Sequence, residues 1–213
     1  MTVSLSKIEL QQTIAKRVAK ELKGSITVNL GVGIPTLVPK FIEDPKVHLH
    51  TENGLLGVTD VKEEDPNLVN ASKLPVGEAV GASYFDSAGS FGMIRGGHVD
   101  MAILGALQAD ETGQIANWAV PGKNIIGVGG AMDLLVGAKK VIVAMSHASK
   151  DGESKIMEKL TYPKTSNRSV DMIITDLAVF EVRERQLYLL ELAPGISVEE
   201  VQEKTEANFI VDL

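Results

Sequence analysis

The chain has 213 residues, of which 44% are hydrophobic, 4% are aromatic and 20 are glycine. This length and apolar content suffice for one sizeable core, so we expect a single domain over residues 1–213. The formal net charge of −7 argues against a nucleic-acid-binding surface, which needs clustered Lys and Arg. The sequence contains no cysteine, which excludes disulfides, thiolate metal sites and a cysteine nucleophile.

Residues 1–23 carry charges of both signs. They contain no apolar stretch of the length found in a signal peptide or a membrane-spanning helix. We therefore expect a chain that is neither secreted through a signal peptide nor bound to a membrane, and that acts in the cytoplasm.

The first half of the chain predicts two helices and two strands. Apolar residues recur on one face of residues 5–22, which predicts a helix, and residues 26–30 form the first expected strand. A glycine loop follows, and a second helical pattern begins near Pro35. Residues 46–51 alternate as in a strand that ends abruptly at Glu52.

The second half predicts further buried strands. Residues 59–79 are polar and acidic, and we expect them to run over the surface, with a solvated charge cluster at residues 63–65. Mainly apolar runs at residues 99–104, 141–145 and 170–174 are typical of buried parallel strands. A hairpin is expected over residues 178–192, before a short helix from Val198. Strands that alternate with helices predict an α/β layered sheet with an antiparallel addition near the C-terminus.

The glycine loop after the first strand allows three interpretations. It has the spacing Gly31-x-Gly33, but Thr36 stands where a dinucleotide-binding loop needs its third glycine. The match to such a loop is therefore weak. The glycines can simply serve a tight turn, or the loop can form a helix start that accepts an anionic group of a ligand.

Glu52 is the strongest candidate for chemistry from position alone. It follows an apolar strand, and ligands of open α/β sheets bind beyond the carboxyl ends of strands. Gly54 permits a positive φ and the close approach of a bulky substrate, while Asn53 can donate hydrogen bonds without adding charge. The alternative is a glutamate in a surface turn with no chemical role.

Other conspicuous side chains have simpler interpretations. His98 is a candidate base, but we favour a buried histidine that orients a turn. His48 and His50 lack a third metal ligand, so we expect two surface residues and no metal site. We expect Trp118 and Phe91 to pack in the core or an interface.

Residues 49–57, Leu-His-Thr-Glu-Asn-Gly-Leu-Leu-Gly, resemble the active-site signature of family I coenzyme A transferases. The usual form is Leu-(His or Gln)-Ser-Glu-Asn-Gly followed by aliphatic residues and Gly, and the one departure is Thr51, which keeps the hydroxyl. Further blocks match in the same order, at residues 29–35, 85–87, 90–91, 93–100, 104–106, 116–118, 121–123 and 129–134. The chain is most similar to the β subunits of 3-oxoacid and acetate/acetoacetate-type transferases.

This resemblance implies a layered α/β fold of the superfold that sugar-phosphate isomerases share with coenzyme A transferases. It implies that Glu52 carries coenzyme A as a covalent thioester and that the Gly130 N–H stabilises the oxyanion. Asn29 matches a residue near the reacting thioester, and Lys73 a lysine near coenzyme A. The substrate-binding residues that we expect are Asn29, Lys73, Gly31, Gly33, Asn53 and Gly54.

The resemblance also implies a partner. Coenzyme A would be a substrate rather than a permanently bound cofactor, and the acids would be a short-chain acid and a 3-oxoacid such as acetoacetate. The β subunits pair with an α subunit that carries its own glycine-rich motif. This sequence contains no such second half, so we expect a hetero-oligomer.

Three alternatives remain open. An acyl-CoA hydrolase could use the same Glu52. A sugar-phosphate isomerase is suggested by analogy of fold, but the Glu-Asn-Gly turn and the Gly-Gly-Ala-Met-Asp block argue against it. The chain could also be a catalytically silent binding or assembly subunit, which the presence of Glu52 disfavours.

Overall fold

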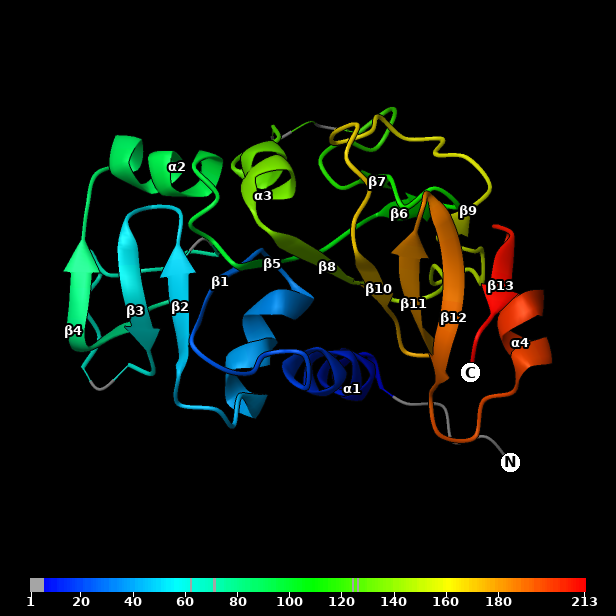
Figure 1. Ribbon diagram of the computed structural model, residues 1–213, viewed down its shortest axis with the longest axis horizontal. Coiled ribbons are helices and arrows are strands. Elements are labelled where there is room, and N and C mark those ends of the chain that lie inside the picture. The colour runs from blue at the N-terminus through cyan, green and yellow to red at the C-terminus, as the bar shows by residue number, and fades with distance from the viewer. Residues whose placement is uncertain (1–5, 62, 71, 124, 126) are drawn as a thin grey trace.

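The computed structural model describes residues 6–61, 63–70, 72–123, 125 and 127–213 (Figure 1). In this part of the chain, ten strands form one mixed sheet. Their spatial order is β13 (Phe209–Val211), β12 (Gln186–Leu192), β11 (Ala178–Arg183), β10 (Met172–Ile174), β8 (Lys140–Ala144), β5 (Met101–Leu104), β1 (Ile26–Leu30), β2 (Val47–Thr51), β3 (Leu55–Thr59) and β4 (Gly77–Tyr84).

Among the described residues, a smaller sheet and five helical segments complete the fold. The small sheet has the order β7 (Ile115–Ala116), β6 (Gln108–Asp110) and β9 (Ile156–Met157). The helical segments are α1 (Lys7–Ala19), η1 (Ile34–Phe41), α2 (Ser87–Arg95), α3 (Ala131–Gly137) and α4 (Val198–Glu203). None of the described helices is long and apolar enough to cross a membrane.

The centre of the large sheet is parallel, antiparallel strands adjoin it on both sides, and β13 pairs in parallel with β12 at one end. Strands β2, β1, β5, β8 and β10 pair in parallel. The hairpin of β3 and β4 continues the sheet beyond β2, while β11 and β12 continue it beyond β10. The predicted α/β layered sheet with an antiparallel addition near the C-terminus is thus confirmed.

Both faces of the central strands are covered, which explains why they read as continuous apolar runs. In β5, Met101 and Ile103 belong to the core cluster that includes α1 residues, whereas Ala102 and Leu104 belong to the cluster that includes α2 and α3 residues. Helices α1 and η1 therefore lie on one face of the sheet and helices α2 and α3 on the other (Figure 1).

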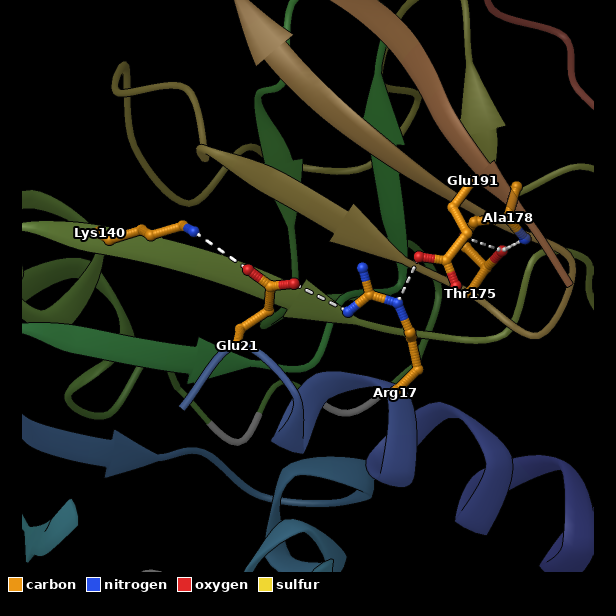
Figure 2. A network of polar contacts seen from close by, with 6 residues as sticks. All are labelled: Arg17, Glu21, Lys140, Thr175, Ala178 and Glu191. Atoms are coloured by element: carbon orange, nitrogen blue, oxygen red, sulfur yellow. Dashed lines mark hydrogen bonds and ion pairs between the residues drawn. The ribbon is translucent and has the colours of Figure 1, made fainter. Parts of the chain in front are cut away.

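Helix α1 is fixed to the sheet by ion pairs as well as by its apolar face. A capping box of Ser6 and Glu9 starts the helix. Arg17 then binds Glu191 of β12 at 2.9 Å, and Glu21 binds Lys140 of β8 at 3.4 Å, as Figure 2 shows. The Arg17 side chain is only 18% exposed, whereas the Glu191 side chain is 46% exposed, so solvent screens this pair in part.

The order of the strands creates a crevice at the carboxyl edge of the sheet. From β1 the chain moves to β2 on one side and later returns to β5 on the other side. Such a switch point opens a crevice between the two diverging loops, where ligands of this fold class bind. The Gly31 N–H donates to Ile103 O at 2.8 Å, and a Cβ on Gly31 would lie 3.2 Å from that oxygen. Close packing of the β1 and β5 ends therefore favours glycine at this position.

Three details differ from the sequence-based expectations. The helical pattern after Gly33 forms a 3-10 helix with Pro39 inside it, and proline lacks the N–H that an α-helix needs. Residues 77–79 of the expected surface excursion belong instead to the edge strand β4, and β13 is among the strands that were not predicted. Residue 5 of the first expected helix, like residues 62 and 71 of the excursion, lies outside the described residues.

Candidate functional site

Glu52 lies directly beyond the carboxyl end of β2, where the crevice opens. Its side chain is half-buried, and the amide Nδ2 of Asn29 donates to its Oε2 at 3.3 Å. Parallel pairing sets Asn29 of β1 opposite His50 of β2. The sheet register therefore places the Asn29 amide beside His50, two residues before Glu52.

The orientation of the Asn29 amide follows from its neighbours. Its Nδ2 also lies 3.0 Å from His50 Nδ1 and 3.3 Å from the His50 carbonyl oxygen. The carbonyl and the carboxylate can only accept hydrogen bonds, so the NH₂ group must face them. The opposite atom, Asn29 Oδ1, is buried and has no partner within the described part of the chain.

His50 is buried in the protein interior rather than exposed, which corrects the expectation of a surface histidine. Its side chain is 1% exposed, and its ring stacks on Phe85 with the centroids 5.8 Å apart. Its Nε2 lies 3.1 Å from Ser90 Oγ on helix α2. Burial lowers the pKa of His50 to about 4, so the imidazole is neutral near pH 7.

The turn after Glu52 can form only with glycine at residue 54. Gly54 has φ of 119°, and a Cβ there would lie 2.1 Å from the backbone oxygen of Phe85. Hydrogen bonds from Gly54 N to Thr51 O and from Phe85 N to Gly54 O, both 3.0 Å, hold the turn. The turn thus needs glycine for the approach of Phe85, a partner within the chain that the sequence analysis did not foresee.

Gly130 lies against Glu52 from the other side of the crevice. It is the N-cap residue of α3, and a Cβ on it would be 3.4 Å from Glu52 Cγ and 3.3 Å from Phe91 Cζ. Helix α3 is held beside α2 by Asp133, which binds Arg95 at 2.7 Å. Residues far apart in the sequence, Asn29, Glu52 and Gly130, therefore meet at one place.

The remaining predicted binding residues lie around this centre. Asn53 is exposed, and its Nδ2 donates to Val69 O at 2.7 Å, which ties the loop between β3 and β4 to the Glu52 turn. Lys73 is exposed on that loop with φ of 60°. Gly33 precedes η1 with φ of 94°. Gly33 and Asn53 thus lie at the carboxyl edge of the sheet with Glu52, whereas the loop that carries Lys73 is linked to this edge through the hydrogen bond between Asn53 and Val69.

A cavity of about 490 Å³ adjoins the end of β2. Its lining includes Leu49 and Thr51 of β2 and Asn70 and Leu74 of the loop that carries Lys73. Thr51 Oγ1 is buried and has no hydrogen-bond partner among the described residues. The lining of this cavity also includes Thr36 and Lys40 of η1, and none of Asn29, Glu52 and Gly130 belongs to it. The cavity is therefore separate from the Glu52 carboxylate.

Other predicted roles are settled by position. The His98 side chain is exposed, not buried. The backbone N–H of His98 donates to Met93 O at 2.9 Å just after α2 ends, and the preceding Gly97 has φ of 74°. His48 is exposed, as expected. Trp118 is half-buried and Phe91 packs against the core. Among the residues that the structure describes, no three His, Asp or Glu side chains form a metal-binding group.

Ser90 and Phe85 support the site but were not singled out from the sequence. Both contact His50. Their only sequence signal was membership of matching blocks at residues 85–87 and 90–91, because a serine and a phenylalanine have no chemistry that marks them in isolation.

The chain matches a known protein family and has close relatives within it. Residues 11–204 match the coenzyme A transferase family. One subunit of the succinyl-CoA:3-ketoacid coenzyme A transferase of Helicobacter pylori is 49% identical over 207 residues, covering 96% of this chain and 100% of that protein. The β subunit of the acetate CoA-transferase of Escherichia coli is 48% identical over 205 residues, covering 96% and 95% respectively.

A solved structure shows the same fold. An acyl-CoA transferase of Escherichia coli O157:H7, in a thioester complex with coenzyme A, has a TM-score of 0.76 at 22% identity. The match covers 99% of this chain and 43% of that chain, so this protein spans less than half of that transferase.

The chain belongs to the coenzyme A transferase family. The family consists of enzymes of the transferase class, for which coenzyme A is a substrate.

Because Phe85 O lies so close to Gly54, we expect substitutions of Gly54 to lower the free energy of unfolding. Gly54→Ala should lower the free energy of unfolding by more than about 3 kcal/mol, because a strained φ adds to a collision with a backbone atom. Gly81→Ala is the matched control, since Gly81 also has positive φ but a Cβ there meets nothing within 4 Å. It should cost about 1–2 kcal/mol. Equal losses in urea denaturation of the two variants would contradict the role of the Phe85 contact.

Proposed function

We propose that the chain is the β subunit of a transferase that moves coenzyme A between a short-chain acyl-CoA and a 3-oxoacid or another carboxylic acid. The observation that carries the proposal is the Glu52 carboxylate at the carboxyl edge of the sheet, contacted by Asn29 Nδ2 at 3.3 Å and bordered by Gly130. The named relatives act on succinyl-CoA with 3-ketoacids or on acetate, which supports this choice of acids.

Glu52 would act as the nucleophile. Its carboxylate attacks the thioester carbonyl, and the thiolate of coenzyme A leaves to give a mixed anhydride. The thiolate then attacks the Glu52 carbonyl of this anhydride, which forms the glutamyl thioester and releases the first acid. The second acid repeats these steps in reverse. One thioester replaces another, so the exchange is near balance and needs no separate energy source.

The surroundings of Glu52 suit this chemistry. The N–H of Asn29 holds one carboxylate oxygen, which leaves the other oxygen to attack. The backbone N–H of Gly130 is the proposed donor to the oxyanion that develops in the attack, because Gly130 borders Glu52 and has no side chain to obstruct the substrate. The neutral His50 brings no positive charge to compete for the carboxylate.

Coenzyme A would approach past the loop between β3 and β4. Lys73 offers an exposed positive charge there for a phosphate group, and Asn53 ties this loop to the Glu52 turn at 2.7 Å. Gly31 and Gly33 would leave room for the substrate on the β1 side, and Gly54 would contribute through the shape of the turn.

The active enzyme would need an α subunit. Both relatives are named as one subunit of their enzyme, and this chain spans only 43% of a longer transferase chain. We propose a hetero-oligomer of the cytoplasm in which the α subunit completes the crevice. A hydrolase that uses the same Glu52, or a silent assembly subunit, is distinguished by the experiment that follows.

Exchange by the assembled complex tests this function. The chain mixed with its α-type subunit should transfer coenzyme A from acetyl-CoA or succinyl-CoA to acetoacetate, while the chain alone should show little turnover. High-performance liquid chromatography of the acyl-CoA products measures both. Full turnover by the chain alone would contradict the need for a partner. Loss of thioester at the same rate without an acceptor acid would identify a hydrolase, and no reaction in the complex would identify a silent subunit.

Substitution of Gly130 tests the oxyanion role. Gly130→Val should reduce turnover on the order of a hundredfold or more, because the branched side chain enters the space beside Glu52 and disturbs the donor. Gly130→Ala should lose less, since its Cβ meets its neighbours at 3.3–3.4 Å, a distance that small shifts relieve. Near-normal turnover in a folded Gly130→Val variant would remove Gly130 from the site.

A further inference from the structure

We propose that His50 is a positioning residue, whose imidazole fixes the Asn29 amide so that its N–H faces Glu52. This inference rests on the proposed function, because it assigns a role within the same site. The inference concerns two hydrogen bonds, one between Ser90 of α2 and His50 of β2 and one between His50 and Asn29 of β1.

The three side chains form a continuous line that ends at Glu52. Ser90 Oγ lies 3.1 Å from His50 Nε2, and His50 Nδ1 lies 3.0 Å from Asn29 Nδ2. Asn29 and Ser90 are both completely buried, and His50 is 1% exposed. Water therefore has little access to replace either contact.

The chemistry of the line requires a neutral imidazole in one tautomer. Asn29 Nδ2 is a donor, so His50 Nδ1 must carry no proton, and His50 Nε2–H then donates to Ser90 Oγ. Burial lowers the pKa of His50 to about 4, which keeps this form at neutral pH. Stacking on Phe85 limits rotation of the ring.

The orientation of the Asn29 amide depends on the contact with His50, because the amide oxygen has no hydrogen-bond partner among the described residues. Asn29 Oδ1 is buried without a partner in the described residues, so no bond at that atom keeps the amide from turning over. A turned amide would point Oδ1 at the Glu52 carboxylate, where two acceptors repel each other. The Asn29 NH₂ group has two N–H bonds and three acceptors within reach, so one N–H faces Glu52 Oε2 and the other is shared between His50 Nδ1 and the His50 carbonyl oxygen. Of the two His50 contacts, only the one at Nδ1 can be removed by substitution.

The test uses the complex with the α-type subunit and acetyl-CoA with acetoacetate as substrates. His50→Leu should lower kcat tenfold to a hundredfold while KM changes less than about threefold, because the substrate-binding surface is retained. His50→Gln keeps an NH₂ group that can donate and a carbonyl oxygen that can accept, as the two nitrogens of the neutral imidazole do, and should recover kcat to within about fivefold of wild type. His48→Leu is the matched control on the same strand, since His48 is exposed, and should leave kcat unchanged.

A double-mutant cycle separates positioning from general damage to the site. If His50 acts through Asn29, the Asn29→Ala and Asn29→Ala/His50→Leu variants should have the same kcat within about twofold. Multiplied losses in the double variant, or a His50→Leu variant with kcat within twofold of wild type, would overturn the inference.

Two further outcomes are decisive. If His50→Leu does not fold, Ser90→Ala replaces it: a kcat loss of about threefold or more that disappears in the Asn29→Ala background supports the inference, and an unchanged kcat overturns it. If the wild-type and His48→Leu complexes both fail to exchange acyl groups, the proposed function is contradicted, and the inference about His50 is contradicted with it. Exchange by wild type with no effect at His50 defeats the inference alone.

Discussion

The contact between the Asn29 amide and the Glu52 carboxylate is the interaction on which the site depends. It joins the ends of two parallel strands, and it exists because β1 and β2 pair with Asn29 opposite His50. A shift of one residue in this register would send Asn29 to the other face of the sheet. The buried strands β1 and β5, covered on both faces, make such a shift costly, so the fold itself fixes the position of the amide.

Tight backbone packing shapes the rest of the crevice. Phe85 O lies so close to Gly54 that no Cβ fits there, and Glu52 and Phe91 leave little room for a Cβ on Gly130. These contacts hold Glu52 from two directions on rigid elements rather than on a free loop. In the proposed mechanism, preorganised groups of this kind would lower the cost of reaching the transition state, because they need no rearrangement during the attack. The loop that carries Lys73 differs, since one side-chain hydrogen bond from Asn53 ties it to this turn.

The sequence predicted the parallel strands and the position of Glu52, because apolar runs and an abrupt turn depend on local pattern. It did not predict where His50 lies. On β2 this residue alternates with Leu49, which suggests a solvent-facing side chain, but helix α2 and Phe85 cover that face. His98 was misjudged in the opposite sense, because the end of α2 directs it outward. Burial of both depends on how α2 packs, which residue spacing cannot reveal. The strand β4 escaped prediction because its exposed residues and glycines lack an apolar face.

Trapping the intermediate tests the proposed covalent role of Glu52. The complex should be incubated with acetyl-CoA in the absence of an acceptor acid, digested, and examined by mass spectrometry. We predict a coenzyme A adduct on the peptide that contains Glu52. Hydroxylamine should convert it to a hydroxamate, and it should be absent from Glu52→Gln, whose neutral amide is a poor nucleophile. An adduct on a different residue, or acyl exchange by Glu52→Gln after deamidation to Glu has been excluded by mass, would contradict this covalent role.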